Sequence, residues 1–394
     1  MGFGQQQGHA GFSAFRSLLI GGAMAVAIAL LAVPAQALNI TTKAREAILM
    51  DAETGTVLYE HAADELMPPA SMSKLMTLLM VFDRLANGSL SMDDTFPVSE
   101  KAWRKGGSKM FVMVGAEVSV ADLLRGIVIQ SGNDACIVIA EGIAGDEETF
   151  AAMMTDRGRE IGLTNSTFRN ATGWPDPEHH MTARDLATLA RFIIRNYPDY
   201  YALFAETEFT WQGIRQPNRN PLLGSYRGAD GLKTGHTETA GYGLVASAER
   251  DGRRLISVVN GLDSDRERAA ESRRLLNIGF QEFDNYTLLS AGQTVDEADV
   301  WLGDRDHIPL VVADQLRLTL PRDVRQGLEA KLHYQNPVPA PVEKGAQIGT
   351  LRLTAPEMAP IEIPVLAGEP AGKLGFFGRI SAAFNYLLWG ASSG

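Results

Sequence analysis

One stretch of sequence restricts both the local structure and the chemistry of this chain: Pro69-Ala70-Ser71-Met72-Ser73-Lys74-Leu75-Met76-Thr77. From Ser71 to Ala86 the apolar residues recur every three or four positions, which predicts an amphipathic helix that stops at Asn87-Gly88. Ser71 and Lys74 are three residues apart, so their side chains share one helix face and can exchange a proton. Such a pair can acylate, because a neutral lysine accepts the proton of a hydroxyl that attacks a carbonyl.

This Ser-x-x-Lys pattern is a weak signal on its own. About one such match is expected by chance in a chain of this length, and Ser71 has the alternative role of a helix N-cap. Catalysis also requires that the pKa of Lys74 fall well below its usual value of about 10.4, which burial and a second nearby cation would cause.

Two more short motifs follow along the chain. Ser131-Gly132-Asn133 interrupts two apolar helical stretches, where it offers a hydroxyl for proton relay and an amide for a substrate backbone; the alternative is a plain turn. Lys233-Thr234-Gly235 precedes a predicted hairpin. On an edge strand its lysine and hydroxyl can hold a carboxylate, and its glycine lets substrate approach the backbone. The alternative is an exposed Lys-Thr pair.

Together, the three motifs are specific. Their patterns S-x-x-K, S-x-N and K-T-G, in this order, form the set found in class A β-lactamases and penicillin-binding proteins. The surrounding residues resemble one family more closely, the low-molecular-mass penicillin-binding proteins that act as serine D-alanyl-D-alanine carboxypeptidases. That resemblance runs from about residue 40 to the C-terminus, and it includes the segments Ser131-Gly132-Asn133-Asp134-Ala135, Thr182-Ala183-Arg184-Asp185 and Gly231-Leu232-Lys233-Thr234-Gly235-His236-Thr237.

The resemblance implies a role for each catalytic residue. Ser71 is the expected nucleophile that becomes acylated, and Lys74 is its general base. Ser131 is expected to relay protons between these two residues and the leaving D-alanine. The backbone N–H groups of Ser71 and His236 are expected to form the oxyanion hole.

The resemblance also implies how the substrate is held. Asn133 is expected to orient the peptide, and Thr234 to contact the terminal carboxylate. Lys233 is expected to raise the local positive potential, which keeps Lys74 neutral. Arg219 matches a family arginine beside the carboxylate site, with a surface arginine as the alternative.

Composition excludes several other functions. The 394 residues carry a net charge of −11 with a pI near 5.2, which argues against nucleic-acid binding. The single cysteine, Cys136, excludes an internal disulfide and a Cys-based zinc site, and its apolar surroundings predict a core residue. His179-His180 and His236 lack the spacing of a zinc peptidase. We therefore expect no metal and no cofactor.

The patterns and the resemblance together predict an α/β (α+β) fold. Residues 38–283 are expected to form a catalytic domain with an antiparallel sheet flanked by helices, and residues 284–369 a small all-β domain. The clearest elements are two hairpins and a charged helix: Ala47 to Asp51 with Thr56 to Glu60, Gly243 to Glu249 with Arg254 to Leu262, and Ser264 to Phe283.

Both ends of the chain suggest export and membrane attachment. Residues 1–37 resemble a signal peptide that ends at Ala35-Gln36-Ala37, with an uncleaved anchor as the alternative. Residues 370–394 predict an amphipathic helix too short to span a bilayer, so we expect it to lie on the periplasmic face of the inner membrane. The alternative is a helix packed on the protein's own core or in a dimer interface.

The function implied is removal of the terminal D-alanine from peptidoglycan pentapeptide stems, with β-lactam antibiotics as inhibitors. One alternative is a β-lactamase-like hydrolase of the same fold, for which Asp176 or Glu178 would be the carboxylate that assists deacylation. The other is a non-catalytic wall-binding protein.

Overall fold

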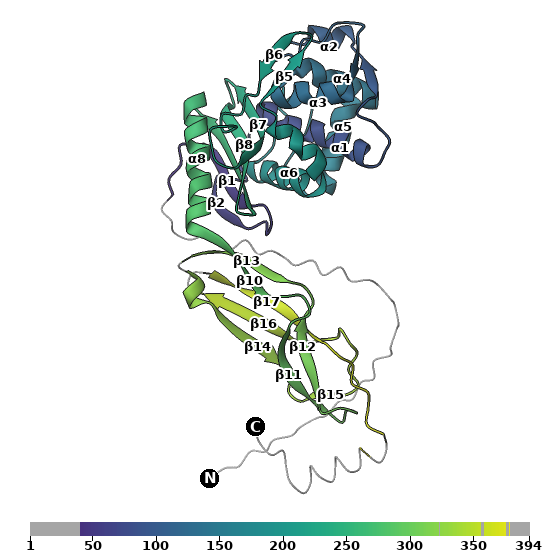
Figure 1. Cartoon of the computed structure of the whole chain (residues 1–394), viewed down its shortest axis with the longest axis vertical. Coiled ribbons are helices and arrows are strands. Elements are labelled where there is room, and N and C mark those ends of the chain that lie inside the picture. The colour runs from purple at the N-terminus through teal and green to yellow at the C-terminus, as the bar shows by residue number, and fades with distance from the viewer. Residues whose placement is uncertain (1–39, 323, 356–357, 376–377, 379–394) are drawn as a thin grey trace, which may run out of the picture. The chain divides into compact units, whose positions relative to one another are not determined.

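The computed structural model describes residues 40–322, 324–355, 358–375 and 378 (Figure 1). The expected signal segment, residues 1–37, and most of the expected terminal helix, residues 370–394, lie outside them. Among the described residues, no helix has both the length and the apolar character needed to cross a membrane.

A five-stranded antiparallel sheet is the centre of the first domain, with the strand order β2-β1-β9-β8-β7. Both predicted hairpins are confirmed. The strands of this sheet are β1 (Glu46–Asp51), β2 (Val57–His61), β7 (Ala229–Thr237), β8 (Gly241–Arg250) and β9 (Arg253–Leu262). Two short pairs lie outside it: β3 (Thr95–Pro97) with β4 (Glu117–Ser119), and β5 (Glu208–Trp211) with β6 (Ile214–Pro217). Because β7 is an edge strand, one side of its backbone is free to face a ligand.

Helices cover both faces of this sheet (Figure 1). One face packs against α8 (Asp265–Glu282), and the other packs against a larger helical cluster that includes α1 and α6. The helices of this cluster and its surroundings are η1 (Ala70–Ser73), α1 (Lys74–Ala86), α2 (Glu100–Arg104), α3 (Val120–Ile129), α4 (Asn133–Ala144), α5 (Glu147–Glu160), α6 (Ala183–Asn196), α7 (Pro198–Tyr201) and η2 (Ala202–Ala205).

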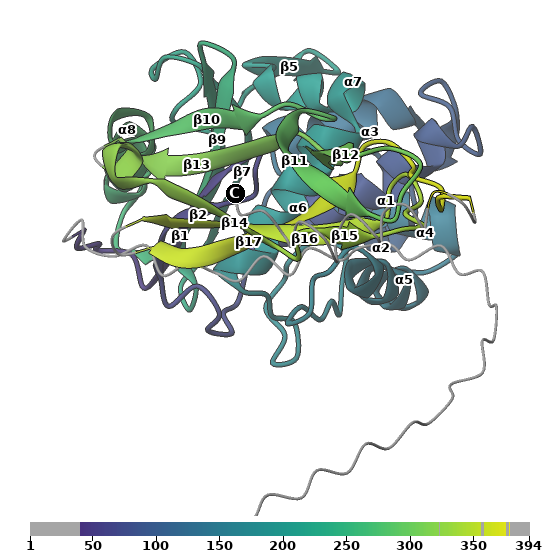
Figure 2. The ribbon, with the colours of Figure 1, turned by 90° about the horizontal axis from the view of Figure 1, so that it is seen from below.

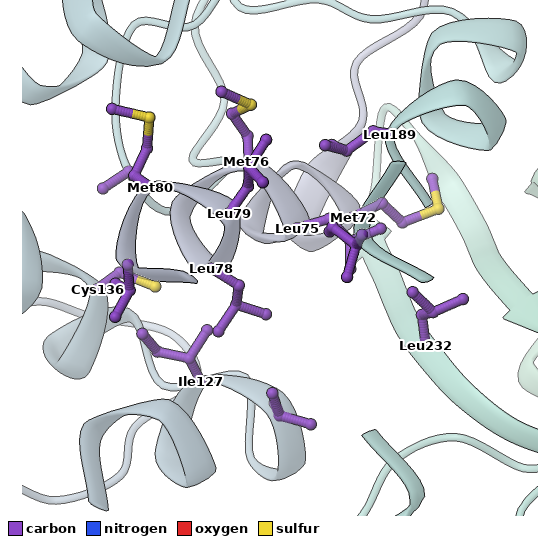
Figure 3. Packing of buried hydrophobic residues seen from close by; sticks show 14 of the residues in the cluster. Met72, Leu75, Met76, Leu78, Leu79, Met80, Ile127, Cys136, Leu189 and Leu232 are labelled. Carbon is purple, nitrogen blue, oxygen red and sulfur yellow. The ribbon is translucent and has the colours of Figure 1, made fainter. Parts of the chain in front are cut away.

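Helix α1 lies in the middle of the apolar core. Its apolar residues, among them Leu75 and Leu79, are fully buried between the other helices and the sheet (Figure 3). The predicted helical period is therefore confirmed, but Ser71 does not begin the α-helix. It lies in the 3₁₀ turn η1, because the Met72 N–H bonds to Pro69 O at 3.1 Å, an i to i−3 bond.

The chain after Phe283 forms a separate all-β domain with its own apolar core. Figure 2 shows its strands, with β10 beside β13. Strands β10 and β13 pair with each other, and the remaining strands form a sheet in the order β14-β16-β17-β12-β11-β15. The elements are β10 (Phe283–Leu289), β11 (Thr294–Trp301), β12 (His307–Val312), β13 (Leu316–Pro321), η3 (Val324–Gly327), β14 (Glu329–Tyr334), β15 (Val338–Pro339), β16 (Gln347–Ala355) and β17 (Met358–Ala367). The predicted fold class is confirmed.

Candidate active site

Ser71 and Lys74 meet at the start of α1. The Lys74 Nζ lies 2.8 Å from Ser71 Oγ, and it donates a hydrogen bond to Thr172 O at 2.5 Å. The Lys74 side chain is completely buried, and burial lowers its pKa to about 8. Cys136 opposes this lowering of the pKa, and the charges of Arg219 and Lys105 contribute to it. A lysine with a pKa of about 8 is partly neutral at slightly alkaline pH, and the neutral amine is the form that a general base requires.

A second buried lysine reaches the same place from strand β7. The Lys233 Nζ donates to Ser131 Oγ at 2.9 Å and to Thr234 O at 3.2 Å. Burial holds the pKa of Lys233 well below its usual range, and the charge of Lys74 lowers it further. Because this repulsion is mutual, each ammonium group favours loss of the other's proton. The exposed Lys-Thr alternative for this motif is therefore wrong.

The second motif forms the short connection between α3 and α4. Ser131 has a left-handed backbone with φ of 63°, which a non-glycine residue adopts only under constraint from its surroundings. This conformation holds its hydroxyl against Lys233. Asn133 begins α4, and its Nδ2 donates to Gly106 O at 2.9 Å. Both residues are buried, so the motif is not a plain surface turn.

Asp134 is a structural contributor to which the sequence analysis gave no role. Its buried carboxylate accepts hydrogen bonds from the backbone N–H groups of Met110, Phe111 and Val112, at 2.8, 2.8 and 3.2 Å. It thereby fixes the loop that carries Ser108. The available signal was an acidic residue placed directly before an apolar helix, where an unpaired charge would be costly to bury.

The arginine expected beside the carboxylate site faces the two lysines. The Arg219 side chain donates to Ser108 Oγ at 2.5 Å, and its charge lowers the pKa of both Lys74 and Lys233. Arg219 is an exposed residue, as the surface alternative expects, yet its charge reaches both buried lysines. Ser108 was also missed, since a lone serine in a loop gives no sequence signal.

A cleft of about 570 Å³ opens above these groups. Its lining includes Ser71, Gly107, Ser108, Asn133, Thr172, Gly173, Trp174, Pro175, His236, Thr237, Glu238 and Thr239. The exposed ring of His236 lies 3.9 Å, between centroids, from the ring of Tyr242 on β8. Ser71, Asn133 and His236 thus line one opening. The other site residues adjoin it through hydrogen bonds, Lys74 to Ser71, Lys233 to Ser131 and Arg219 to Ser108.

The glycine of the third motif has a role within the protein itself. A Cβ on Gly235 would lie 3.0 Å from both Pro69 O and Met72 Cγ. Its small size therefore lets β7 pack closely on η1, which brings Lys233 and Ser71 to the same opening. The contact that requires glycine here is with the protein itself.

The residues considered for deacylation, for metal binding and for the core are not part of the Ser71–Lys74 site. Asp176 accepts a hydrogen bond from the Glu178 N–H, and Glu178 pairs with Arg169 at 2.7 Å. Neither residue lines the cleft that contains Ser71. His179 is buried, and burial lowers its pKa to about 4. Within the part of the chain that the structure describes, no group of three or more His, Cys, Asp or Glu side chains is placed to hold a metal ion. Cys136 is buried in the core as predicted.

Comparison with known proteins identifies the family. A family profile described as D-alanyl-D-alanine carboxypeptidase matches residues 32–264, and a second profile, penicillin-binding protein 5, C-terminal domain, matches residues 283–374. The chain belongs to the serine D-alanyl-D-alanine carboxypeptidases. The resemblance read from the three motifs is therefore confirmed.

Individual relatives support this assignment over most of the chain. This carboxypeptidase is 41% identical over 345 residues to D-alanyl-D-alanine carboxypeptidase DacC of Escherichia coli (strain K12), covering 86% of each chain. Penicillin binding protein 5 from Haemophilus influenzae is 34% identical with a TM-score of 0.78, and the match covers 86% of this chain and 100% of that one. Penicillin-Binding Protein D2 from Listeria monocytogenes, solved in an ampicillin-bound form, is 31% identical with a TM-score of 0.57, covering 62% of this chain and 99% of that one.

The geometry predicts that Gly173 is essential to the site. Its φ is +74°, and a Cβ there would lie 1.9 Å from Ala70 O, so the Gly173→Ala change must displace either Ala70 or Thr172. Thr172 O is the acceptor for Lys74, so we expect the rate of acylation by penicillin to fall at least about 100-fold, equivalent to about 2.7 kcal/mol.

Gly162 provides the matched control. It has a similar φ of +88°, but no atom lies within 4 Å of the position that a Cβ would occupy there. Gly162→Ala should cost about 1 kcal/mol of stability, through backbone strain alone, and leave acylation unchanged. Equal acylation rates for the two variants would contradict the packing argument.

Proposed function

We propose that this carboxypeptidase removes the terminal D-alanine from peptidoglycan pentapeptides through an acyl-enzyme on Ser71. The observation that carries the proposal is the 2.8 Å contact between the Ser71 hydroxyl and a buried lysine whose pKa is about 8. A serine paired with an ordinary exposed lysine would have no base available at neutral pH.

In the first half of the reaction, neutral Lys74 takes the hydroxyl proton as Ser71 Oγ attacks the carbonyl carbon of the penultimate D-alanine. The backbone N–H groups of Ser71 and His236 stabilise the negative oxygen that forms. The tetrahedral intermediate then expels the terminal D-alanine, whose amine receives the proton from Lys74 by way of Ser131. An ester on Ser71 remains.

The second half repeats this chemistry with water. Lys74, neutral again, takes a proton from a water molecule that attacks the ester carbonyl, and the returning proton restores the Ser71 hydroxyl. A β-lactam follows the first half of this sequence, but its amine stays tethered to the acyl group. Because Asp176 and Glu178 are engaged with other partners, the structure favours slow release of the drug over β-lactamase activity.

The substrate carboxylate is assigned to the cationic end of the cleft. Arg219 supplies positive charge there, and the Lys233 amine and the hydroxyls of Ser108 and Thr234 supply hydrogen-bond donors. Asn133 lies at the cleft wall, where its amide can contact the peptide backbone. This arrangement selects a free C-terminus, which separates a carboxypeptidase from a non-catalytic wall-binding protein.

We place the enzyme on the periplasmic face of the inner membrane, after loss of residues 1–37. The apolar stripe in residues 370–394 supports attachment to the lipid surface. The described end of the chain supports a C-terminal tether on the β domain, because Ala371 pairs with Val342, and Leu374 N–H bonds to Leu302 O at 2.9 Å.

Ser71→Ala should abolish both D-alanine release and covalent labelling by penicillin, because no other group replaces the attacking oxygen. Mass spectrometry of the protein after incubation with penicillin measures the adduct, and thermal unfolding should change little. Ser89→Ala, at an exposed serine beyond α1, should label like the wild type. A penicillin adduct on the Ser71→Ala protein would overturn the assignment.

The two lysines predict a pH dependence. Activity requires neutral Lys74, so it should rise with pH and level off above the pKa of about 8. Arg219→Ala removes a positive charge that lowers the pKa of Lys74, so it should raise that pKa and move the rising limb to higher pH. Superimposable pH–rate profiles for the two proteins would rule out this coupling.

Removal of the terminal segment tests the tether. A chain ending at Gly375 keeps the pairing of Ala371 and Leu374, so we expect it to fold, to appear in the soluble periplasmic fraction and to keep its activity on a small soluble peptide. The full-length protein should sediment with membranes. Sedimentation of the shortened chain after signal cleavage would contradict the tether.

A further inference from the structure

The acceptor of the Lys74 hydrogen bond lies in a loop outside the three motifs, at residues 170–174. Thr172 O accepts from Lys74 Nζ at 2.5 Å, and it belongs to the peptide group between Thr172 and Gly173. Helix α1 also contacts the preceding carbonyl. Thr77, three residues after Lys74 and on the same helix face, donates to Ala171 O at 2.7 Å. Two successive carbonyls of this loop therefore meet α1.

Asn170 holds the loop on both sides of that peptide group. Its Oδ1 accepts hydrogen bonds from the Thr172 N–H at 3.1 Å, from the Thr172 hydroxyl at 2.9 Å and from the Trp174 N–H at 3.0 Å. Its Nδ2 donates to Trp174 O at 3.0 Å. The peptide group that carries Thr172 O thus lies between two N–H groups that one amide side chain fixes.

The direction of Thr172 O affects proton transfer. A neutral lysine amine has two N–H bonds and one lone pair. When one N–H of neutral Lys74 donates to Thr172 O, rotation of the amine is restricted, and its lone pair can face Ser71 Oγ, 2.8 Å away. Because Thr172 O contacts a completely buried amine, the loop is also part of the cover that keeps water away from Lys74.

We propose that Asn170 is a positioning residue, which holds Thr172 O against Lys74 and so directs the lysine at Ser71. The proposal rests on the acyl-enzyme mechanism proposed above and adds to it a residue outside the three motifs. Asparagine suits this position because its side chain accepts and donates hydrogen bonds at once. Alanine makes neither kind of contact, and an ionised aspartate only accepts.

The rate of Ser71 acylation by penicillin, measured against pH, tests this role. Asn170→Ala should lower the plateau rate at least about ten-fold, equivalent to about 1.4 kcal/mol, because Lys74 is no longer directed at Ser71 Oγ. Water should also reach the Lys74 amine, so its pKa should rise and the rising limb should move to higher pH by about half a unit or more.

This shift of the limb reports the burial of Lys74. The charged and titratable groups that interact electrostatically with Lys74 remain in the Asn170→Ala protein. They come from α4, from β7 and from connecting loops: Asp134, Cys136, Lys233, Lys105, Arg219 and His179. Burial is the largest cause of the low pKa of Lys74, so a loosened loop should change it most.

Two further variants divide the contacts of Asn170. Asn170→Asp keeps the accepting oxygen, so its plateau rate should stay within about three-fold of the wild type, while its negative charge should move the limb to higher pH. Asn170→Gln keeps the amide but displaces it by one methylene group. It should show both changes expected of Asn170→Ala, to a smaller extent, and it provides the test if Asn170→Ala does not fold.

Asn87→Ala is the matched control. Asn87 Oδ1 accepts from the Ser89 N–H at 3.0 Å, the same two-residue step as from Asn170 to Thr172, in the turn that follows α1. This variant should lose some thermal stability and keep both the plateau rate and the pH profile of the wild type.

The outcomes separate the two proposals. Wild-type plateau rates and limbs in Asn170→Ala and Asn170→Gln would overturn the positioning role, and so would a lower rate that follows the loss of folded protein with an unmoved limb. In both cases a penicillin adduct on Ser71 of the wild-type enzyme still supports the proposed function. Absence of that adduct and of D-alanine release in the wild type would instead overturn the proposed function.

Discussion

Two lysine side chains buried in one small volume are the constraint on which this site depends. Lys74 and Lys233 come from α1 and β7, which are distant in sequence, and each is almost fully removed from water. Burial lowers the pKa of both, and the charge of Lys74 lowers the pKa of Lys233 further. The protein thereby obtains a neutral amine near physiological pH without a histidine or a metal ion in the proposed mechanism.

The surrounding backbone is strained in a way that serves this arrangement. Ala70, which precedes Ser71, and Ser131, which contacts Lys233, both have positive φ values, 48° and 63°. Gly173 occupies a position where even a methyl group would collide with Ala70 O. Such conformations cost on the order of 1–3 kcal/mol each and persist only when the packing around them imposes them. The rigid apolar core around α1 provides that packing, so the stability of the core is used to hold the reactive groups.

The cleft is lined both by residues of the family motifs and by residues outside them. In the proposed function, the three motifs account for bond cleavage and for binding of the terminal carboxylate. Trp174 lies outside those motifs and also lines the cleft, and the Lys105 Nζ lies 4.6 Å from the centroid of its ring. Residues at the wall of a cleft can change substrate preference without changing the reaction, because they contact parts of the substrate that do not react.

Much of this protein was determined by local sequence. The period of apolar residues in α1, the capping Ser119 of α3, and the Asp251-Gly252 turn of the second hairpin each depend on neighbouring residues, so they could be predicted from the sequence. The Ser-x-x-Lys spacing likewise places two side chains on the same face of one turn. The family, and with it the fold, followed from three motifs read together.

Tertiary structure decided the rest, since it depends on contacts between distant segments. Asp134 is important because its carboxylate meets the loop at Met110, more than twenty residues earlier. The role of Gly235 depends on the approach of η1 to β7, and the low pKa of Lys74 depends on burial that its own sequence neighbours do not supply alone. Desolvation and close packing are properties of the assembled core. The reactive residues could therefore be identified from the sequence, but their protonation states depend on the folded chain.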